Sequence, residues 1–513
     1  MRDLAYLKLL SREYPNIRAA ASDIINLQAI CGLPKGTEYF FSDLHGEHEA
    51  FIYLLRSSSG IIREKIRETF GHIISEEDEV RLANLIYYPE KMINQIKQAN
   101  EYTEDWQKTA VYRLVQICRE VSSKYTRSKV RKKMPKEFSG VIDELLYVDN
   151  TDDNKTEYYS ELINTLIDVR VADSFIVVIC SLIRSLTIDN LHILGDIFDR
   201  GPRPDIILEE LMHFHDVDIQ WGNHDISWMG AATGNRACIC NVLRMALGYN
   251  GFDVLEDGYG INLRPLSMFA ERVYRDDPCT CFLPQILDKN IYDAVDPKLA
   301  AKMHKAIAVL QYKEEGQIIK RHPEYGMEER ILLSAIRYDR GTVTIDGKEY
   351  PMRDMNFPTV DPADPLRLTD EEEELLHTLE LSFRHNARLH EHVRFLYSNG
   401  SMYKCCNSNL LYHGCIPMTE NREFDGLMVG GKMYRGKELM DFIDTQVKNA
   451  YFLPEDAPEK EACRDFMWYL WNGAKSPVFG KDKNRSFEHY FIEDPEVMRE
   501  TMNPYYQLSE EEE

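Results

Sequence analysis

The stretch Leu191-His-Ile-Leu-Gly-Asp-Ile-Phe-Asp-Arg-Gly201 decides the fold that we predict for this chain. Its first four residues are mainly apolar and predict a short buried strand. A turn follows at once, bounded by Gly195 and Gly201 and carrying two aspartates and an arginine. Polar side chains at the carboxyl end of a buried strand are typical of a ligand site in an α/β protein.

Three other short apolar segments also lead directly into polar clusters. Residues 39–42 precede Asp43-Leu-His45, residues 217–221 precede Gly222-Asn-His-Asp225, and residues 410–412 precede His413-Gly414. Long segments rich in helix-forming residues separate these clusters. The sequence therefore predicts an α/β (α+β) protein in which short strands carry the site and large helical insertions lie between them.

We divide the chain into segments on this pattern. The expected segments are an N-terminal helical part at 1–37, a core at 38–47, 188–230 and 405–420, a helical insertion at 48–187, a second, mostly helical insertion at 231–404, and a C-terminal helical part at 421–513 whose acidic tail at 510–513 should be disordered. Residues 342–350 predict a β-hairpin with Asp346 and Gly347 in its turn. Thr369, followed by an acidic run, predicts the N-cap of a helix.

Composition excludes several classes of protein. The chain has 61 basic and 85 acidic residues, a net charge of −24, which disfavours nucleic acid as a partner. No apolar run approaches the roughly 18 residues of a membrane span, so we expect no membrane partner. The N-terminus does not resemble a secretory signal, and the eleven cysteines are scattered. A cytoplasmic protein with reduced thiols is the expectation.

Together, the clusters suit two divalent metal ions that clamp a phosphate and activate a water molecule. Carboxylate, amide oxygen and imidazole are suitable ligands for such ions. Asp196 is the candidate for a bridging carboxylate, and Arg200 can bind phosphoryl oxygens with its planar fork. His224, oriented by Asp199, is the candidate acid that protonates the departing alkoxide.

Three of the four clusters also have a structural interpretation. Asp43 and His45 alone could lie on an ordinary surface loop, Asp199 and Arg200 could form a simple ion pair, and a single histidine such as His413 is more often structural. The occurrence of all four clusters after apolar segments in one chain favours the metal site.

The order Asp-x-His, Gly-Asp-x-x-Asp-Arg-Gly, Gly-Asn-His-Asp and His-Gly resembles the calcineurin-like metallophosphatases. The segments 33–51, 191–204, 470–473 and 487–492 resemble, more narrowly, the class III fructose-1,6-bisphosphatases of Firmicutes. The resemblance covers nearly the whole chain. It implies a metallophosphatase β-sandwich flanked by helices, and a hydrolase of phosphoric monoesters that uses manganese. The implied gluconeogenic reaction converts fructose 1,6-bisphosphate to fructose 6-phosphate and phosphate.

The resemblance also implies a role for each site residue. Asp43 and His45 would hold the first metal ion, and Asp196 would bridge to the second. Asn223 and His413 would complete the second site. His224 and Asp199 would be the acid pair and Arg200 the phosphate clamp, with no organic cofactor.

The chain departs from that family near its end. The family carries one more metal-binding histidine in a late Gly-His motif, whereas this chain ends seven residues after Tyr506. We therefore expect the late strands of the second sheet to be missing, the second metal site to lack a ligand, and activity to be reduced. His489 is a poor substitute for that ligand. A homo-oligomer and a complementing C-terminal chain are both left open as partners.

Two other functions stay open at this point. The motifs also suit a different metallophosphoesterase, acting on phosphoproteins or dinucleotide polyphosphates. The expected loss of a ligand suits a non-catalytic subunit with a vestigial site. The sequence assigns no residue to the fructose ring.

Overall fold

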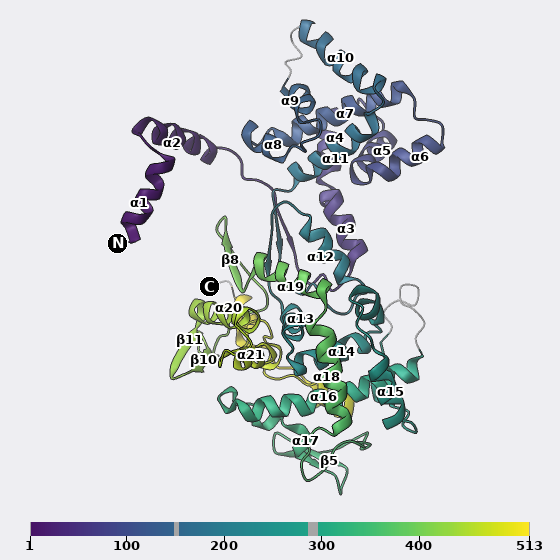
Figure 1. The fold of residues 1–513 in the computed structure, drawn as a ribbon, viewed down its shortest axis with the longest axis vertical. Helices are drawn as coiled ribbons and strands as arrows, with labels where there is room; N and C mark the ends of the chain where they lie inside the picture. Colours follow the sequence, from purple (N-terminus) through teal and green to yellow (C-terminus); the bar gives the residue numbers. More distant parts are fainter. Residues whose placement is uncertain (1, 148–152, 286–295, 512–513) are drawn as a thin grey trace. The chain divides into compact units, whose positions relative to one another are not determined.

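The computed structural model describes residues 2–147, 153–285 and 296–511 (Figure 1). The chain forms two compact units, one made of Met1–Tyr39 and Ile52–Leu191 and the other of Phe40–Phe51 and His192–Glu513. Of the acidic tail at 510–513, the last two residues lie outside the described part. Glu511 is described, and its carboxylate pairs with Arg422.

The first unit is helical, in agreement with the leucine- and isoleucine-rich pattern of its sequence. Buried side chains such as Ile62, Leu114, Phe175 and Ile183 form one hydrophobic core within it. Its helices are α1 (Arg2–Glu13), α2 (Ile17–Cys31), α4 (Ile61–Phe70), α5 (Glu76–Tyr87), α6 (Pro89–Gln98), α7 (Glu104–Ser122), α8 (Arg127–Lys133), α9 (Ser139–Tyr147), α10 (Asp153–Asp168) and α11 (Ala172–Thr187).

A four-stranded sheet has the order β1-β2-β3-β7. Its strands are β1 (Glu38–Phe41), β2 (Asn190–Ile193), β3 (Val217–Gln220) and β7 (Gly400–Ser401). The first three match the strands predicted at 39–42, 191–194 and 217–221. Strands β3 and β7 are parallel, with Ile219 opposite Gly400. The mixed α/β class predicted from the sequence is therefore confirmed.

The strand predicted at 410–412 exists but lies outside this sheet. It is β9 (Asn409–Tyr412), which pairs with β8 (Tyr403–Cys406) in an antiparallel hairpin. Leu410 keeps 51% of its surface exposed, whereas its neighbour Leu411 is buried. Strand β9 is therefore less buried than β2 and β3. The sheet takes its fourth strand from β7, which the sequence pattern did not indicate.

Two further small sheets lie in the second unit. One contains β4 (Ile336–Arg337), β5 (Thr342–Ile345) and β6 (Lys348–Pro351), and the other contains β10 (Gly426–Val429) and β11 (Lys432–Arg435). The β5–β6 turn confirms the predicted hairpin, with Asp346 at φ 49° and Gly347 at φ 78°. Two successive positive φ angles are the geometry that Asp-Gly favours in such turns.

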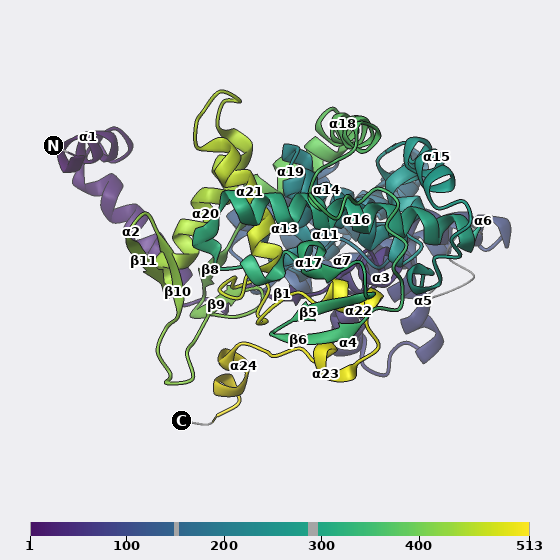
Figure 2. The same ribbon diagram turned by 90° about the horizontal axis from the view of Figure 1, so that it is seen from below.

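Helices of 6 to 25 residues surround the site-bearing segments of the second unit. They include α12 (Pro204–Met212), α13 (Asn223–Thr233), α14 (Arg236–Gly248), α15 (Arg264–Val273), α16 (Pro297–Arg321), α18 (Asp370–Arg384), α19 (Ala387–Asn399), α20 (Gly436–Phe452), α21 (Lys460–Asn472) and α22 (Ser486–Phe491). Helix α14 packs against both α13 and α16, and α13 also packs against α21 (Figures 1 and 2). Within the described residues, no helix combines the length and apolarity needed to cross a membrane.

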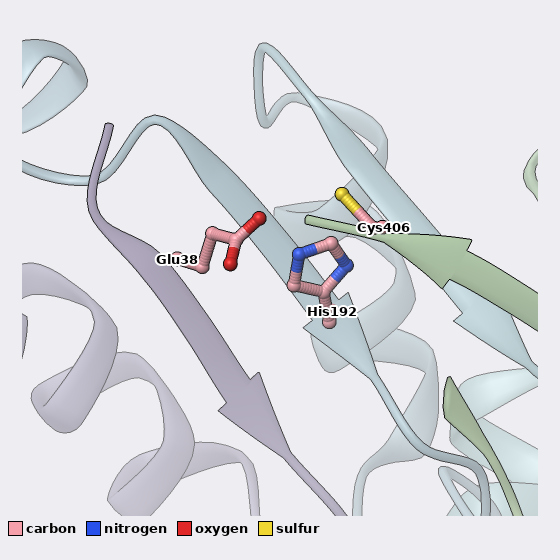
Figure 3. A group of neighbouring side chains, drawn as sticks. All are labelled: Glu38, His192 and Cys406. Atoms are coloured by element: carbon pink, nitrogen blue, oxygen red, sulfur yellow. The ribbon is translucent and has the colours of Figure 1, made fainter. Parts of the chain in front are cut away.

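A buried polar cluster links strands β2, β3 and β8. His192 Nδ1 lies 2.8 Å from the Asp218 carboxylate, which also accepts hydrogen bonds from Lys404 and Gln220. Figure 3 shows His192 on β2 and Cys406 on β8. Burial alone raises the pKa of Asp218, but the hydrogen bonds from His192 and Lys404 hold it below its usual value.

Helix α18 begins at the predicted cap. Thr369 Oγ1 accepts a hydrogen bond from the Glu372 amide (3.2 Å), and the Glu372 carboxylate accepts one from the Thr369 amide (2.8 Å). The same carboxylate lies 2.7 Å from Lys313 Nζ of α16, and both side chains are almost fully buried. This ion pair joins two helices across the interior of the unit.

Replacing Lys313 with methionine should lower the free energy of unfolding by about 3–5 kcal/mol, because Glu372 would be left charged and unpaired. Urea unfolding of the purified protein measures this change. The double variant Lys313→Met/Glu372→Gln removes both charges and should recover most of the loss. A single variant as stable as the wild type would contradict the assignment.

Candidate active site

All eight site residues expected from the sequence lie in the second unit. Asp43 and His45 follow β1, Asp196, Asp199 and Arg200 follow β2, Asn223 and His224 open α13 after β3, and His413 follows β9. Backbone hydrogen bonds hold the first two loops together. The Asp43 amide donates to the Gly195 carbonyl (3.1 Å), and the His45 amide donates to the Asp196 carbonyl (2.8 Å).

The loops can approach closely because glycines stand where they meet. Gly195 has a φ of 82°, and a Cβ atom there would lie 2.6 Å from the Gly222 amide nitrogen and 2.7 Å from His413 Nδ1. A Cβ atom at Gly222 would overlap the Asp196 carboxylate. Both glycines are therefore required by the close packing of the site, as the turn in the sequence suggested for Gly195.

The Asp196 carboxylate lies between two imidazoles. Its Oδ2 atom is 3.9 Å from His45 Nε2 and 3.4 Å from His413 Nε2. Asp43 Oδ1 lies 3.8 Å from His45 Nε2, and the side chain of Asp43 is 57% exposed. Asp196, which the sequence predicts to bridge two metal ions, therefore lies close to both histidines.

Both imidazoles have the orientation of metal ligands. The Nδ1 atoms of His45 and His413 lie 3.0 Å and 2.6 Å from the carbonyl oxygens of Phe198 and Leu194. A carbonyl oxygen can only accept, so each Nδ1 carries the proton and each Nε2 presents a lone pair toward Asp196. Burial, together with the nearby His224, holds the pKa of His45 below its ordinary value, which keeps the ring neutral. These donors fit a divalent cation.

His224 and Asp199, which the sequence predicts to act as an acid pair, lie in direct contact. His224 Nδ1 lies 2.7 Å from Asp199 Oδ2, and the other oxygen of Asp199 accepts a hydrogen bond from Trp228 Nε1 (2.8 Å). Burial alone lowers the pKa of His224, but the hydrogen bond to Asp199 and the charge of Asp196 outweigh it and raise the pKa. The ring packs edge-on against Trp471, with 4.9 Å between the ring centroids.

Asp225 has a structural role that sequence reasoning did not assign. Its Oδ2 accepts hydrogen bonds from the amides of Asp196 (2.9 Å) and Gly222 (3.0 Å), and its Oδ1 accepts one from Ile197 (2.8 Å). Burial and the charge of Asp196 raise the pKa of Asp225 to about 6. Its place three residues after the N-cap Gly222 was the available signal, since acidic residues there often bind the cap amide.

A cleft of about 680 Å³ opens onto this group, within the usual range of about 300–1,000 Å³ for small-molecule sites. Asp196, Asn223, His224 and His413 line one part of it. Its wall also carries basic side chains, from Arg200, Arg244, Lys481 and Arg485. Sequence reasoning found only the first of these four, because the other three belong to no motif.

His489 also lines the cleft but does not join the candidate metal ligands. Among the described residues, ligand atoms of His45, Asp196 and His224 lie within 4.8 Å of one another, and this group does not include His489. Its side chain is exposed.

Replacing Asp225 with asparagine should loosen both strand-end loops. Asparagine presents only one acceptor oxygen, so at least one buried amide would face an NH₂ group, at a cost of about 1–3 kcal/mol for each unpaired donor. We expect urea unfolding to show a loss of about 1–3 kcal/mol, and bound metal to fall with it. Asp257→Asn, which changes an exposed acid of the same unit, is the matched control. Equal stability of the two variants would contradict this role.

Comparisons with known proteins give a consistent result. The chain is 51% identical over 511 residues to the fructose-1,6-bisphosphatase class 3 of Clostridium tetani, covering 100% of this chain and 77% of that protein. It is 50% identical over 505 residues to the corresponding protein of Clostridium novyi, covering 98% of this chain and 76% of the relative. The identity to the Bacteroides fragilis protein is also 50%, over 512 residues, with 77% of that protein covered.

No solved structure matches the chain. The family model described as Firmicute fructose-1,6-bisphosphatase matches residues 5–513, which is nearly the whole sequence. That match includes every strand-end loop and helix described above as part of the site. The chain therefore belongs to the Firmicute fructose-1,6-bisphosphatase family.

Proposed function

We propose that this protein hydrolyses fructose 1,6-bisphosphate to fructose 6-phosphate and phosphate, a gluconeogenic reaction. The observation that carries the proposal is the Asp196 carboxylate between two inward-facing imidazoles, beside the buried His224–Asp199 pair. The names of the relatives, at 50–51% identity, supply the substrate. The site supplies the chemistry that a phosphoric monoester hydrolase requires.

The proposed metal ligands are Asp43, His45, Asp196, Asn223 and His413. Their mixture of carboxylate, amide and imidazole donors suits manganese among the divalent cations. When bound, a pair of such ions supplies positive charge for the phosphoryl oxygens and lowers the pKa of the attacking water. We also infer that the four-stranded sheet is one layer of a calcineurin-like β-sandwich, because three of its strands lead into site loops.

The protein groups have distinct tasks in this reaction. His224 donates a proton to the oxygen that leaves the phosphorus atom, and the sugar departs as an alcohol. Asp199 fixes the His224 ring through Nδ1 and stabilises its charged form. Arg200, at the edge of the same cleft, offsets negative charge on the phosphoryl oxygens.

Replacing His224 with alanine should reduce phosphate release from fructose 1,6-bisphosphate by about 10²–10⁴-fold, the usual contribution of a positioned acid. The assay uses purified protein with manganese, and metal content and thermal stability are recorded in parallel. His377→Ala, which removes an exposed histidine of α18, is the control and should retain full activity. A preference of the wild type for a phosphopeptide or a dinucleotide polyphosphate would displace the proposed substrate.

Metal removal gives a separate test. Chelation should abolish activity, and manganese should restore it. Elemental analysis should find that Asp196→Asn lowers the bound metal more than Asp43→Asn does, because Asp196 faces both His45 and His413. A wild-type chain that folds normally and binds no metal would favour the non-catalytic alternative.

A further inference from the structure

Arg244 is a buried cation in the wall of the same cleft. It lies on α14 and is only 6% exposed, yet it lines the cleft together with Asp196 and His224. Its guanidinium donates three hydrogen bonds, from Nε to Gln311 (2.7 Å), from Nη1 to the Tyr490 hydroxyl (3.1 Å) and from Nη2 to Asn241 (2.8 Å). These bonds use one donor on each nitrogen, so Nη1 and Nη2 each keep one N–H for another acceptor.

His304 determines which groups donate and which accept in this hydrogen-bond network. Its Nδ1 lies 2.9 Å from the Phe282 carbonyl, so Nδ1 carries the proton and Nε2 accepts from the Tyr490 hydroxyl at 2.9 Å. Burial, with the charge of Arg244, lowers the pKa of His304 to about 3, so the ring is neutral. The Tyr490 oxygen is thereby free to accept from Arg244. Among the described residues, the hydrogen-bond partners of Arg244 are all uncharged.

The other basic groups of the cleft differ in this respect. Lys481 pairs with Glu500 at 2.7 Å, and Arg485 pairs with both oxygens of Asp482 at 2.7 Å and 2.8 Å. Within residues 2–147, 153–285 and 296–511, Arg244 has no carboxylate within the 4.0 Å of an ion pair. The nearest compensation is Glu315, which accepts from Gln311 at 2.7 Å and is therefore two hydrogen bonds away.

A buried charge without a direct counterion is costly unless a bound partner supplies the opposite charge. The open face of Arg244 is the cleft. Phosphate suits its two remaining donors, because a guanidinium binds phosphate oxygens in pairs. A sugar bisphosphate has two anionic ends, and the site around Asp196 accounts for only one.

We propose that Arg244 binds the second phosphate of the sugar bisphosphate, the one that is not hydrolysed. This inference rests on the proposed function and adds the residue that distinguishes a bisphosphate from a monophosphate. Arg244 is thus a specificity-determining residue, which holds the substrate without taking part in bond cleavage.

The side chains that hold Arg244 are connected to the end of the cleft where hydrolysis takes place. Asn241, which accepts from Arg244, donates from Nδ2 to Ser227 Oγ of α13 at 2.8 Å. Helix α13 begins with Asn223 and His224. The position of Arg244 relative to the acid group is therefore set by packed helices and a hydrogen bond, so the cleft selects ligands by the separation of their phosphates.

The test compares fructose 1,6-bisphosphate with fructose 1-phosphate, which lacks the second phosphate. Arg244→Gln should raise the KM for the bisphosphate on the order of 10–100-fold, since one or two charge-assisted hydrogen bonds are lost. The kcat for the bisphosphate and the kcat/KM for fructose 1-phosphate should stay within about threefold of the wild type. Arg244→Lys, which keeps the charge, should show an intermediate KM.

Two variants serve as controls. Arg236→Gln changes another arginine of α14, one that pairs with Glu373 and Glu380, and should not alter the ratio of the two KM values. Tyr490→Phe removes one hydrogen-bond partner of Arg244 and should raise the KM for the bisphosphate alone, by several-fold. Thermal unfolding of each variant reports its stability.

Each outcome separates the inference from the proposed function. A wild type that hydrolyses neither sugar phosphate overturns the proposed function. A wild type with equal KM values for the two substrates overturns the role of Arg244 alone, without the need for any variant. Loss of both activities to the same degree in Arg244→Lys and Arg244→Gln overturns it too, because this is the result of a purely structural arginine.

Discussion

The site depends on one carboxylate that binds three backbone amides. Asp225 joins the loop after β2, through Asp196 and Ile197, to the end of β3, through Gly222. A second bond runs in the opposite direction, from the His224 amide to Asp196 Oδ1 at 3.1 Å. The two loops are therefore fixed to each other from both sides. This fixes where the Asp196 side chain meets the imidazoles.

These bonds hold a backbone that would be unfavourable elsewhere. Asp43, His45, Asp196, Asp199 and Arg200 all have φ between 43° and 69°, a region that non-glycine residues seldom adopt. Such residues persist only where surrounding contacts determine them, at a cost of about 1–3 kcal/mol each. Their concentration in the site loops means that side chains are placed before substrate arrives. The packing of the strands and of α13 offsets this conformational free energy.

The sequence predicted the features that depend on residues adjacent to one another in the chain. Strands β1, β2 and β3 and the clusters that follow them are contiguous, so pattern and composition located them. Arg244 could not be found in this way, because its partners lie at 311 and 490, and its meaning depends on the absence of a nearby carboxylate. Strand β7 is two residues long and has no pattern of its own.

The distribution of charge explains how an acidic chain can bind an anionic sugar. The net charge of −24 acts weakly across solvent, because salt screens it beyond about 8–10 Å. Inside the cleft screening is weaker, and a buried guanidinium acts at short range. Because Lys481 and Arg485 are already paired with carboxylates, they contribute little net positive charge. Arg244 is held by neutral groups within the described part of the chain, so its charge stays available to the cleft. Anion binding in this cleft therefore depends more on which cations lack a counterion than on how many cations are present.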